Sequence, residues 1–357
     1  MSSISDSTGH VSERARQGAP SMTAVRVWLF CVAGLIFAMI LVGGATRLTD
    51  SGLSITEWKP ILGAIPPLGE ADWQDAFEKY KQIPEYEVIN KGMSLSAFKA
   101  IYWWEWTHRL LGRLIGVAFF VPFLYFWVRG AIPRPLFPRL AALFVLGGAQ
   151  GALGWYMVQS GLAERTDVSQ YRLAAHLGLA VLIYGAILWV AFGLGRASAR
   201  REQAPAVLKA MAGAFAVLIF LQIILGAFVA GTDAGLSNNT WPLMDGALIP
   251  DGLGAMQPWY LNLFENVLTV QFDHRMAAYA SALFAVVLAM MSWRSGAGEG
   301  IALVVLAAVL AQIALGVFAL LSHLQIGLAL AHQAGAMLLL ALALYQLHRL
   351  TGLTSRG

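Results

Sequence analysis

Long apolar stretches recur along the chain, separated by polar segments of very different lengths. Each stretch holds about 20 residues, the length with which an α-helix crosses a hydrocarbon layer of roughly 30 Å. The pattern therefore predicts an all-α polytopic membrane protein with eight transmembrane helices. The predicted spans are 25–46, 107–128, 137–157, 172–195, 207–230, 272–293, 301–321 and 325–347.

Composition supports this class. Hydrophobic residues make up 58% of the 357 residues and charged residues only 12%, about half the charge of a soluble domain. Residues 1–24 are polar and contain acids, so we expect neither a cleavable signal nor a mitochondrial transit peptide before the first span. The single cysteine, Cys31, excludes an intrachain disulfide and a thiolate metal site.

Lysine and arginine are unevenly distributed among the connecting segments. Arginines cluster between the second and third spans and after the fourth, whereas residues 232–270 contain neither Lys nor Arg. Because basic segments stay in the cytoplasm, and because the rule weakens for long loops, we predict cytoplasmic termini and two outer loops, at about 47–106 and 231–271. The net charge of +4 then reflects topology and does not indicate nucleic-acid binding.

The chain contains an internal duplication. The segment "TDSGLSITEWKPILGA" (49–64) aligns without gaps to "TDAGLSNNTWPLMDGA" (232–247), with eight of sixteen positions identical. Three looser matches follow in the same order: "THRLLGRLIG" with "DHRMAAYASA", "AQGALG" with "AQIALG", and "AAHLGLA" with "LAHQAGA". We predict two tandem four-helix bundles related by a pseudo-two-fold axis along the membrane normal.

The duplication divides the chain into four parts. Two four-helix halves are flanked by short tails, and each half carries one of the long outer loops. The predicted parts are a cytoplasmic tail at 1–24, an N-terminal half at 25–200, a C-terminal half at 201–348 and a second cytoplasmic tail at 349–357.

Four of the seven histidines occupy equivalent positions in the two halves: His108, His176, His274 and His332. Each lies roughly two to eight residues past the outer end of its span, which places all four within one or two helical turns of a common depth. Paired histidines on facing helices suit the axial positions of haem iron, whereas zinc or copper usually requires further ligands. A purely structural hydrogen-bonding role is the alternative.

Arginines lie beside these histidines. Arg109 and Arg275 each follow a candidate ligand directly, and Arg47 and Arg113 lie nearby. Guanidinium groups bind carboxylates in a bidentate manner, so these four arginines are candidate contacts for haem propionates. The alternative is that long basic side chains extend to the membrane interface.

The two halves differ at one position that carries chemistry. Glu105 precedes His108 by three residues, whereas Gln271 precedes His274 by three. Residues at this spacing share a helix face, so a carboxylate can act near one haem in proton transfer or water orientation, while an amide can only hydrogen-bond. The alternative is an interfacial acid paired with one of the arginines that follow it.

The segments "EWTHRLLGR", "GTDAGLSNNTWPLM", "QFDHR" and "AHQAGA" resemble the haem A synthase family. The resemblance covers about residues 25–347. It implies an oxidoreductase that converts the C8 methyl group of haem O to a formyl group by successive water-derived hydroxylations, supplying haem A to cytochrome oxidases.

The resemblance also implies roles for individual residues. His274 and His332 would ligate a resident haem b, and His108 and His176 would hold the substrate haem O. Glu105 would be the catalytic carboxylate. The first outer loop lacks the cysteine pair of one family branch, so the chain resembles the cysteine-less proteobacterial and mitochondrial branch.

The expected location is a bacterial inner membrane, with the haem sites near the periplasmic face. The expected partners are membrane lipid, haem O as substrate, haem O synthase as a neighbour and an unidentified electron acceptor. No nucleic-acid partner is expected. The sequence is compatible with an oligomer.

Two other functions fit parts of the pattern. A bis-histidine dihaem cytochrome would only relay electrons, but it has no evident need for Glu105 at one site. A repeat-built transporter or haem permease would place its ionisable residues near the midplane, whereas here they lie toward the outer face.

Overall fold

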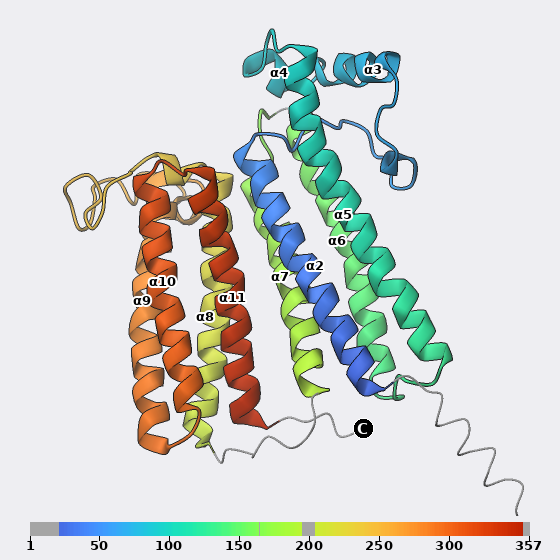
Figure 1. The fold of residues 1–357 in the computed structure, drawn as a ribbon. Helices are drawn as coiled ribbons and strands as arrows, with labels where there is room; N and C mark the ends of the chain where they lie inside the picture. Colours follow the sequence, from blue (N-terminus) through green and yellow to red (C-terminus); the bar gives the residue numbers. More distant parts are fainter. Residues whose placement is uncertain (1–20, 164, 195–203, 353–357) are drawn as a thin grey trace, which may run out of the picture.

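The fold is an assembly of long helices that lie side by side (Figure 1). The computed structural model describes residues 21–163, 165–194 and 204–352. Within these ranges eight helices are long and apolar enough to cross a membrane, which confirms the predicted all-α polytopic class. They are α2 (Met22–Leu48), α5 (Leu95–Val128), α6 (Phe137–Ala163), α7 (Gln170–Gly193), α8 (Ala206–Gly231), α9 (Val267–Ser295), α10 (Glu299–Leu321) and α11 (Ile326–Thr351).

Two helices begin well before the apolar spans predicted for them. Helix α5 begins at Leu95, where the Ser94 hydroxyl accepts a hydrogen bond from the Ala97 N–H. Helix α9 begins at Val267, where the Asn266 side chain accepts from two backbone N–H groups. These caps satisfy the free donors of a first helical turn. Hydrophobicity locates the membrane-crossing part of a helix and not its polar extension.

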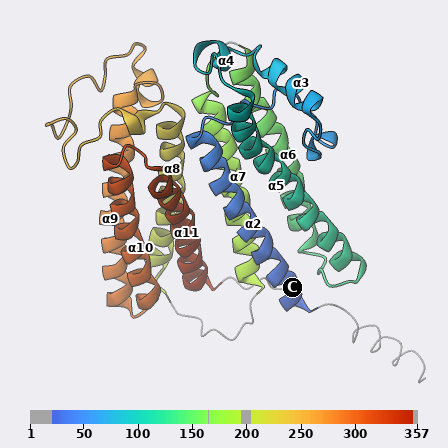
Figure 2. The same ribbon diagram turned by 45° about the horizontal axis from the view of Figure 1, so that its top comes forward.

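The long connections lie at one end of the molecule, hereafter the loop end (Figures 1 and 2). The connection after α2 contains the 3-10 helix η1 (Leu62–Ala64) and the short helices α3 (Glu70–Tyr80) and α4 (Pro84–Val88). The connection after α8 contains the 3-10 helices η2 (Ala234–Leu236) and η3 (Trp259–Leu263). Most of tail 1–24, much of tail 349–357 and the predicted boundary at 200/201 lie outside the described residues.

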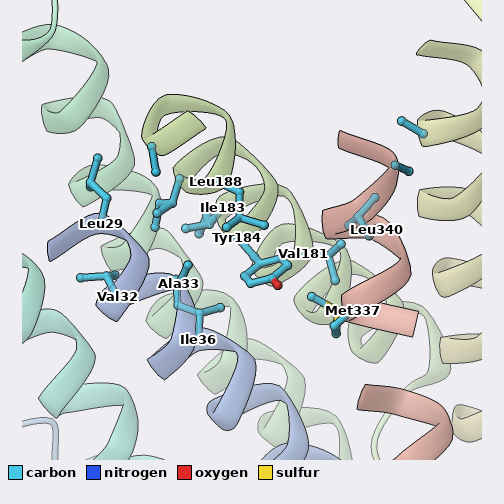
Figure 3. Close-up of a cluster of buried hydrophobic side chains, with 14 of the residues drawn as sticks. Leu29, Val32, Ala33, Ile36, Val181, Ile183, Tyr184, Leu188, Met337 and Leu340 are labelled. Atoms are coloured by element: carbon cyan, nitrogen blue, oxygen red, sulfur yellow. The ribbon is translucent and has the colours of Figure 1, made fainter. Parts of the chain in front are cut away.

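The central core is formed by α2, α7, α8 and α11, while α5 and α6 lie on one side and α9 and α10 on the other (Figures 1 and 2). Figure 3 shows the core where α2, α7 and α11 meet, with apolar side chains from all three helices pointing toward one another. Val32 of α2, Val181 of α7 and Met337 of α11 are almost fully buried there. This packing joins helices from both predicted halves of the chain.

A second core lies at the loop end and supports the polar extension of α5. Phe77 and Tyr80 of α3 pack on Phe98 of α5 with ring centroids 4.9 and 5.2 Å apart. Beneath them the Tyr80 hydroxyl donates to the buried Glu85 carboxylate at 2.8 Å, and burial raises the pKa of Glu85 to about 7. Leu53 belongs to the same core, so the segment after α2 is held over the start of α5.

Candidate functional site

The four candidate histidines lie in the loop-end parts of alternate helices, α5, α7, α9 and α11. The His274 and His332 rings lie edge to face, with centroids 6.4 Å apart and planes at 79°. A metal ion bound between two imidazoles places the two ring centroids about 6 Å apart. Each metal–nitrogen bond is about 2 Å long, and each centroid lies a further half-ring behind its nitrogen. The structure therefore brings His274 and His332 together as predicted, and the pairing of His108 with His176 stays a prediction.

These pairs fit haem better than a metal with more protein ligands. Among the described residues, no three or more His, Cys, Asp and Glu side chains are grouped as they would be around a metal ion. Two imidazoles on facing helices supply the two axial ligands of a haem iron and leave the porphyrin to fill the other positions. The chemistry and spacing of the C-terminal pair thus match the predicted resident haem.

Each candidate histidine packs against a glycine of the preceding long helix. A methyl group added to any of these glycines would lie 2.7 to 3.2 Å from the histidine Cε1 atom, closer than side chains normally approach. The glycines therefore let the rings lie against a helix backbone. The four pairs are Gly43 with His108, Gly154 with His176, Gly226 with His274, and Gly316 with His332.

Replacing Gly316 by alanine should displace the His332 ring and remove most of the resident haem. The added methyl group would lie 2.7 Å from Cε1 of His332, so the ring must move. The measurement is Soret absorbance per mole of purified protein. Gly300→Ala in the same helix is the matched control, since nothing lies within 4 Å of the added group. Equal haem content in both variants would contradict a ligand role for His332.

Glutamines contact three of the four histidines. These glutamines were not predicted as site residues from the sequence. Gln150, Gln222 and Gln312 each lie four residues before one of these glycines. Their side-chain nitrogens donate to the backbone carbonyl of the histidine on the next helix at 2.7 to 2.9 Å. "AQGALG" and "AQIALG" match within the duplication, and this match was the available signal for two of them.

Glu105 lies in α5, three residues before His108, and is 3% exposed. Its Oε2 atom accepts hydrogen bonds from the Ser54 hydroxyl and the Ile55 N–H, both at 2.7 Å. Its Oε1 atom accepts two hydrogen bonds from Arg109, at 2.6 and 3.0 Å. Four donors fill the acceptor positions of a carboxylate. The structure therefore contains the arginine pairing that was the alternative interpretation of Glu105.

The C-terminal half repeats this arrangement with an amide. The Gln271 side chain accepts from Arg275 at 2.9 Å and donates to the Ala234 carbonyl oxygen at 2.5 Å. Arg275 then donates to the Asn238 and Thr240 carbonyls, just as Arg109 donates to the carbonyls of Ile55 and Glu57. Glu105 and Gln271 thus occupy equivalent positions in two matched sets of contacts, one as a carboxylate and the other as an amide.

The candidate propionate contacts are engaged with protein groups. Arg109 and Arg275 donate to loop carbonyls as described, and Arg113 donates to the Pro60 and Lys59 carbonyls at 2.7 and 3.0 Å. Within the described ranges, the buried Nη1 atom of Arg113 and the buried Nε atom of Arg275 have no hydrogen-bond partner. Propionate binding by these three arginines stays a prediction. The nitrogens of Arg113 and Arg275 without a partner are donors that a propionate can use.

Arg47 occupies a different environment at the end of α2. It forms ion pairs with Asp50, Asp167 and Asp233 at 3.2, 2.7 and 2.8 Å, and thereby links the loop segments of both predicted halves. Burial raises the pKa of Asp167 above its ordinary value, although Arg47 opposes this. Arg47 already faces three carboxylates, so these contacts favour a linking role over propionate binding.

The fold and the site together define a class: a polytopic membrane protein with two matched sets of histidines on its helices, one of which has a buried carboxylate three residues before a histidine. The chain belongs to the COX15-CtaA family, described as cytochrome oxidase assembly protein, whose profile it matches over residues 26–344.

Individual relatives agree with this assignment. The heme A synthase of Parvibaculum lavamentivorans is 57% identical over 327 residues, which cover 92% of this chain and 94% of that protein. The heme A synthase of Rhodospirillum centenum is 53% identical over 94% of this chain and 90% of its own length. The heme A synthase of Azorhizobium caulinodans is 56% identical, with coverages of 92% and 96%.

Proposed function

We propose that this protein is a haem A synthase, an oxidoreductase that converts the C8 methyl group of haem O to the formyl group of haem A for cytochrome oxidase assembly. Support comes from the family match over residues 26–344 and from relatives named heme A synthase. The single structural observation that carries the proposal is the difference between the two histidine sites. In the described part of the chain, the N-terminal site has a buried carboxylate, Glu105, where the C-terminal site has the buried amide of Gln271.

The two histidine pairs have different roles in this proposal. His274 and His332 hold a resident haem b, and His108 and His176 hold haem O as the substrate. When bound, the resident haem supplies one-electron transfer between the substrate site and an external electron acceptor. The ring spacing of 6.4 Å in the C-terminal pair and the glycines behind all four rings support this assignment.

The overall reaction fixes what the residues beside the substrate must do. The methyl group and one water become a formyl group, four protons and four electrons, through two hydroxylations and the loss of one water. The site must therefore place water beside the C8 methyl group and remove protons. It also requires an electron acceptor that is not part of the chain.

Glu105 and Ser54 are suited to moving these protons. The Ser54 hydroxyl donates to Oε2 of Glu105 at 2.7 Å, and its own oxygen can still accept a hydrogen bond from water. A proton taken from that water can pass through Ser54 to the carboxylate. Arg109 holds the other carboxylate oxygen in place, so Glu105 is oriented before substrate binds.

The bis-histidine electron relay remains the second candidate, because paired histidines alone are sufficient for it. The two functions differ in whether the bound haem is altered. Expression of the chain in a bacterium that makes haem O but lacks its own haem A synthase separates them. The proposal predicts restored haem a absorbance in the membranes, whereas a relay would leave it absent. Haem O synthase as a physical partner stays a prediction.

The proposed orientation has both termini in the cytoplasm and the loop end at the periplasmic face of the inner membrane. A reporter active only in the cytoplasm should therefore work when fused after Gly357. The same reporter inserted after Gly254, in the second long loop, should be inactive. The physical reason is the excess of Lys and Arg in the short connections. Activity at Gly254 and none at Gly357 would invert the topology.

A further inference from the structure

Four helices, α2, α6, α8 and α10, each carry a glycine that lies against one of the four histidines. Three of these helices share a glutamine at a fixed distance before that glycine, and α2 lacks it. Helices α6, α8 and α10 carry a glutamine four residues before the glycine that faces a histidine, so amide and glycine lie on the same helix face. At the corresponding position of α2, four residues before Gly43, the residue is Met39. The difference falls on the helix that packs against His108.

The three amides contact their histidines in the same way. In each case the side-chain nitrogen lies 3.1 to 3.2 Å from the ring Nδ1 atom and also donates to the histidine backbone carbonyl. The three pairs are Gln150 with His176, Gln222 with His274, and Gln312 with His332.

His108 is the exception among the four. Its Nδ1 atom is buried and has no hydrogen-bond partner among the residues that the structure describes. A thioether at position 39 is at most a weak acceptor and offers no donor. Its methyl group instead packs near Gly112 of α5, 3.3 Å from the position of an added methyl group. The structure thus leaves one ring of the four without a polar group to hold it.

The contact matters because it restrains the ring that presents Nε2 to a metal. Each amide is anchored by its hydrogen bond to the histidine backbone carbonyl, so the ring beside it cannot turn without losing its contact with that amide. A fixed ring orientation strengthens metal ligation. At His332 the backbone carbonyl oxygen of Gln312 also lies 3.2 Å from Nδ1 and can accept from an Nδ1–H group, the tautomer that leaves Nε2 as the ligand atom.

We propose that Gln150, Gln222 and Gln312 are positioning residues that lock three of the four histidines, and that Met39 leaves His108 free to turn. The C-terminal pair, locked on both sides, is built to retain its haem. The N-terminal pair is locked only at His176, so its haem enters and leaves by making and breaking the contact on the His108 side. The assignment of substrate and resident haem rests on the proposed function, but the difference in locking does not.

The first test uses purified holoprotein without haem O, so that no turnover occurs. Excess apomyoglobin is added and the transfer of resident haem is followed by absorbance. Gln222→Met and Gln312→Met should release haem roughly 10–100-fold faster, the range typical of lost outer contacts to metal ligands. Both variants should also shift the midpoint potential and the low-spin electron paramagnetic resonance signal of the resident haem.

Gln346→Met is the matched control, because this glutamine is fully buried in α11 and contacts none of the four histidines. Its release rate and midpoint potential should match those of the unaltered protein. Unchanged rates and spectra in Gln222→Met and Gln312→Met would overturn the positioning role. If the release rates and spectra of Gln222→Met and Gln312→Met change, but the unaltered protein never forms haem A, the positioning role stands and the proposed synthase function fails.

The second test concerns the N-terminal pair in protein loaded with haem O. Met39→Gln should slow transfer of that haem to apomyoglobin by about tenfold or more, with the resident Soret band unchanged. Gln150→Met should accelerate the same transfer, and it tests the proposal even if Met39→Gln fails to fold. Equal rates in Gln150→Met and the unaltered protein would overturn the proposal for the N-terminal pair.

Discussion

Replacing Glu105 by glutamine should abolish haem A formation while leaving the fold and the resident haem intact. The expected loss of rate is about 10²–10⁴-fold, the usual contribution of a positioned acid–base group. The fold should survive because the C-terminal half already has an amide in the same contacts, where Gln271 meets Arg275 and the Ala234 carbonyl. The measurement is chromatography of extracted haems, with Soret absorbance reporting the resident haem.

The reciprocal variant, Gln271→Glu, provides the control. It adds a carboxylate to the other site and should leave haem O oxidation at the N-terminal site in place. Full activity of Glu105→Gln would assign the proton transfers to another residue. In that case the contacts of Glu105 with Ser54, Ile55 and Arg109 would be structural, as the alternative interpretation held.

Alanine at His274 or His332 should remove the resident haem altogether. The two ring centroids are 6.4 Å apart, so loss of either ring would leave the resident haem with one histidine ligand. The expected result is loss of nearly all resident Soret absorbance. Since electrons then have no route to the acceptor, product formation should stop as well.

His108→Ala is the matched control for these variants because it removes the equivalent histidine from the other half. It should keep the resident haem and its spectrum and lose only the binding or oxidation of haem O. A normal resident Soret band in His274→Ala and His332→Ala would contradict the assignment of haem b to the C-terminal pair.

The sequence was sufficient to predict the fold class and the proximity of His274 and His332. All eight apolar spans correspond to helices, because hydrocarbon thickness and helix rise leave little freedom in their length. The starts of α5 and α9 were placed too late, since Ser94 and Asn266 cap the helices before the apolar stretch begins. The pairing of His274 with His332 was predicted from the duplication, because each half carries two histidines at equivalent positions and no distance was needed to group them.

The contacts of the charged residues were harder to predict. Arg113 donates to carbonyl oxygens of the first long loop, and Arg109 divides its hydrogen bonds between two such carbonyls and the Glu105 carboxylate. Backbone acceptors leave no trace in a sequence. The three carboxylates around Arg47 come from separate connections between helices, so their meeting depends on the tertiary fold. The role of Gln222 required knowing which helix packs against α9.

The most direct measurement for the central claim is chromatography of haems extracted from purified protein, expressed with and without a source of haem O. We expect haem b alone without that source, and haem b together with haem A or hydroxylated haem O when the source is present. Haem b alone under both conditions, with no farnesylated haem bound or altered, would contradict a haem A synthase and identify an electron-relay cytochrome.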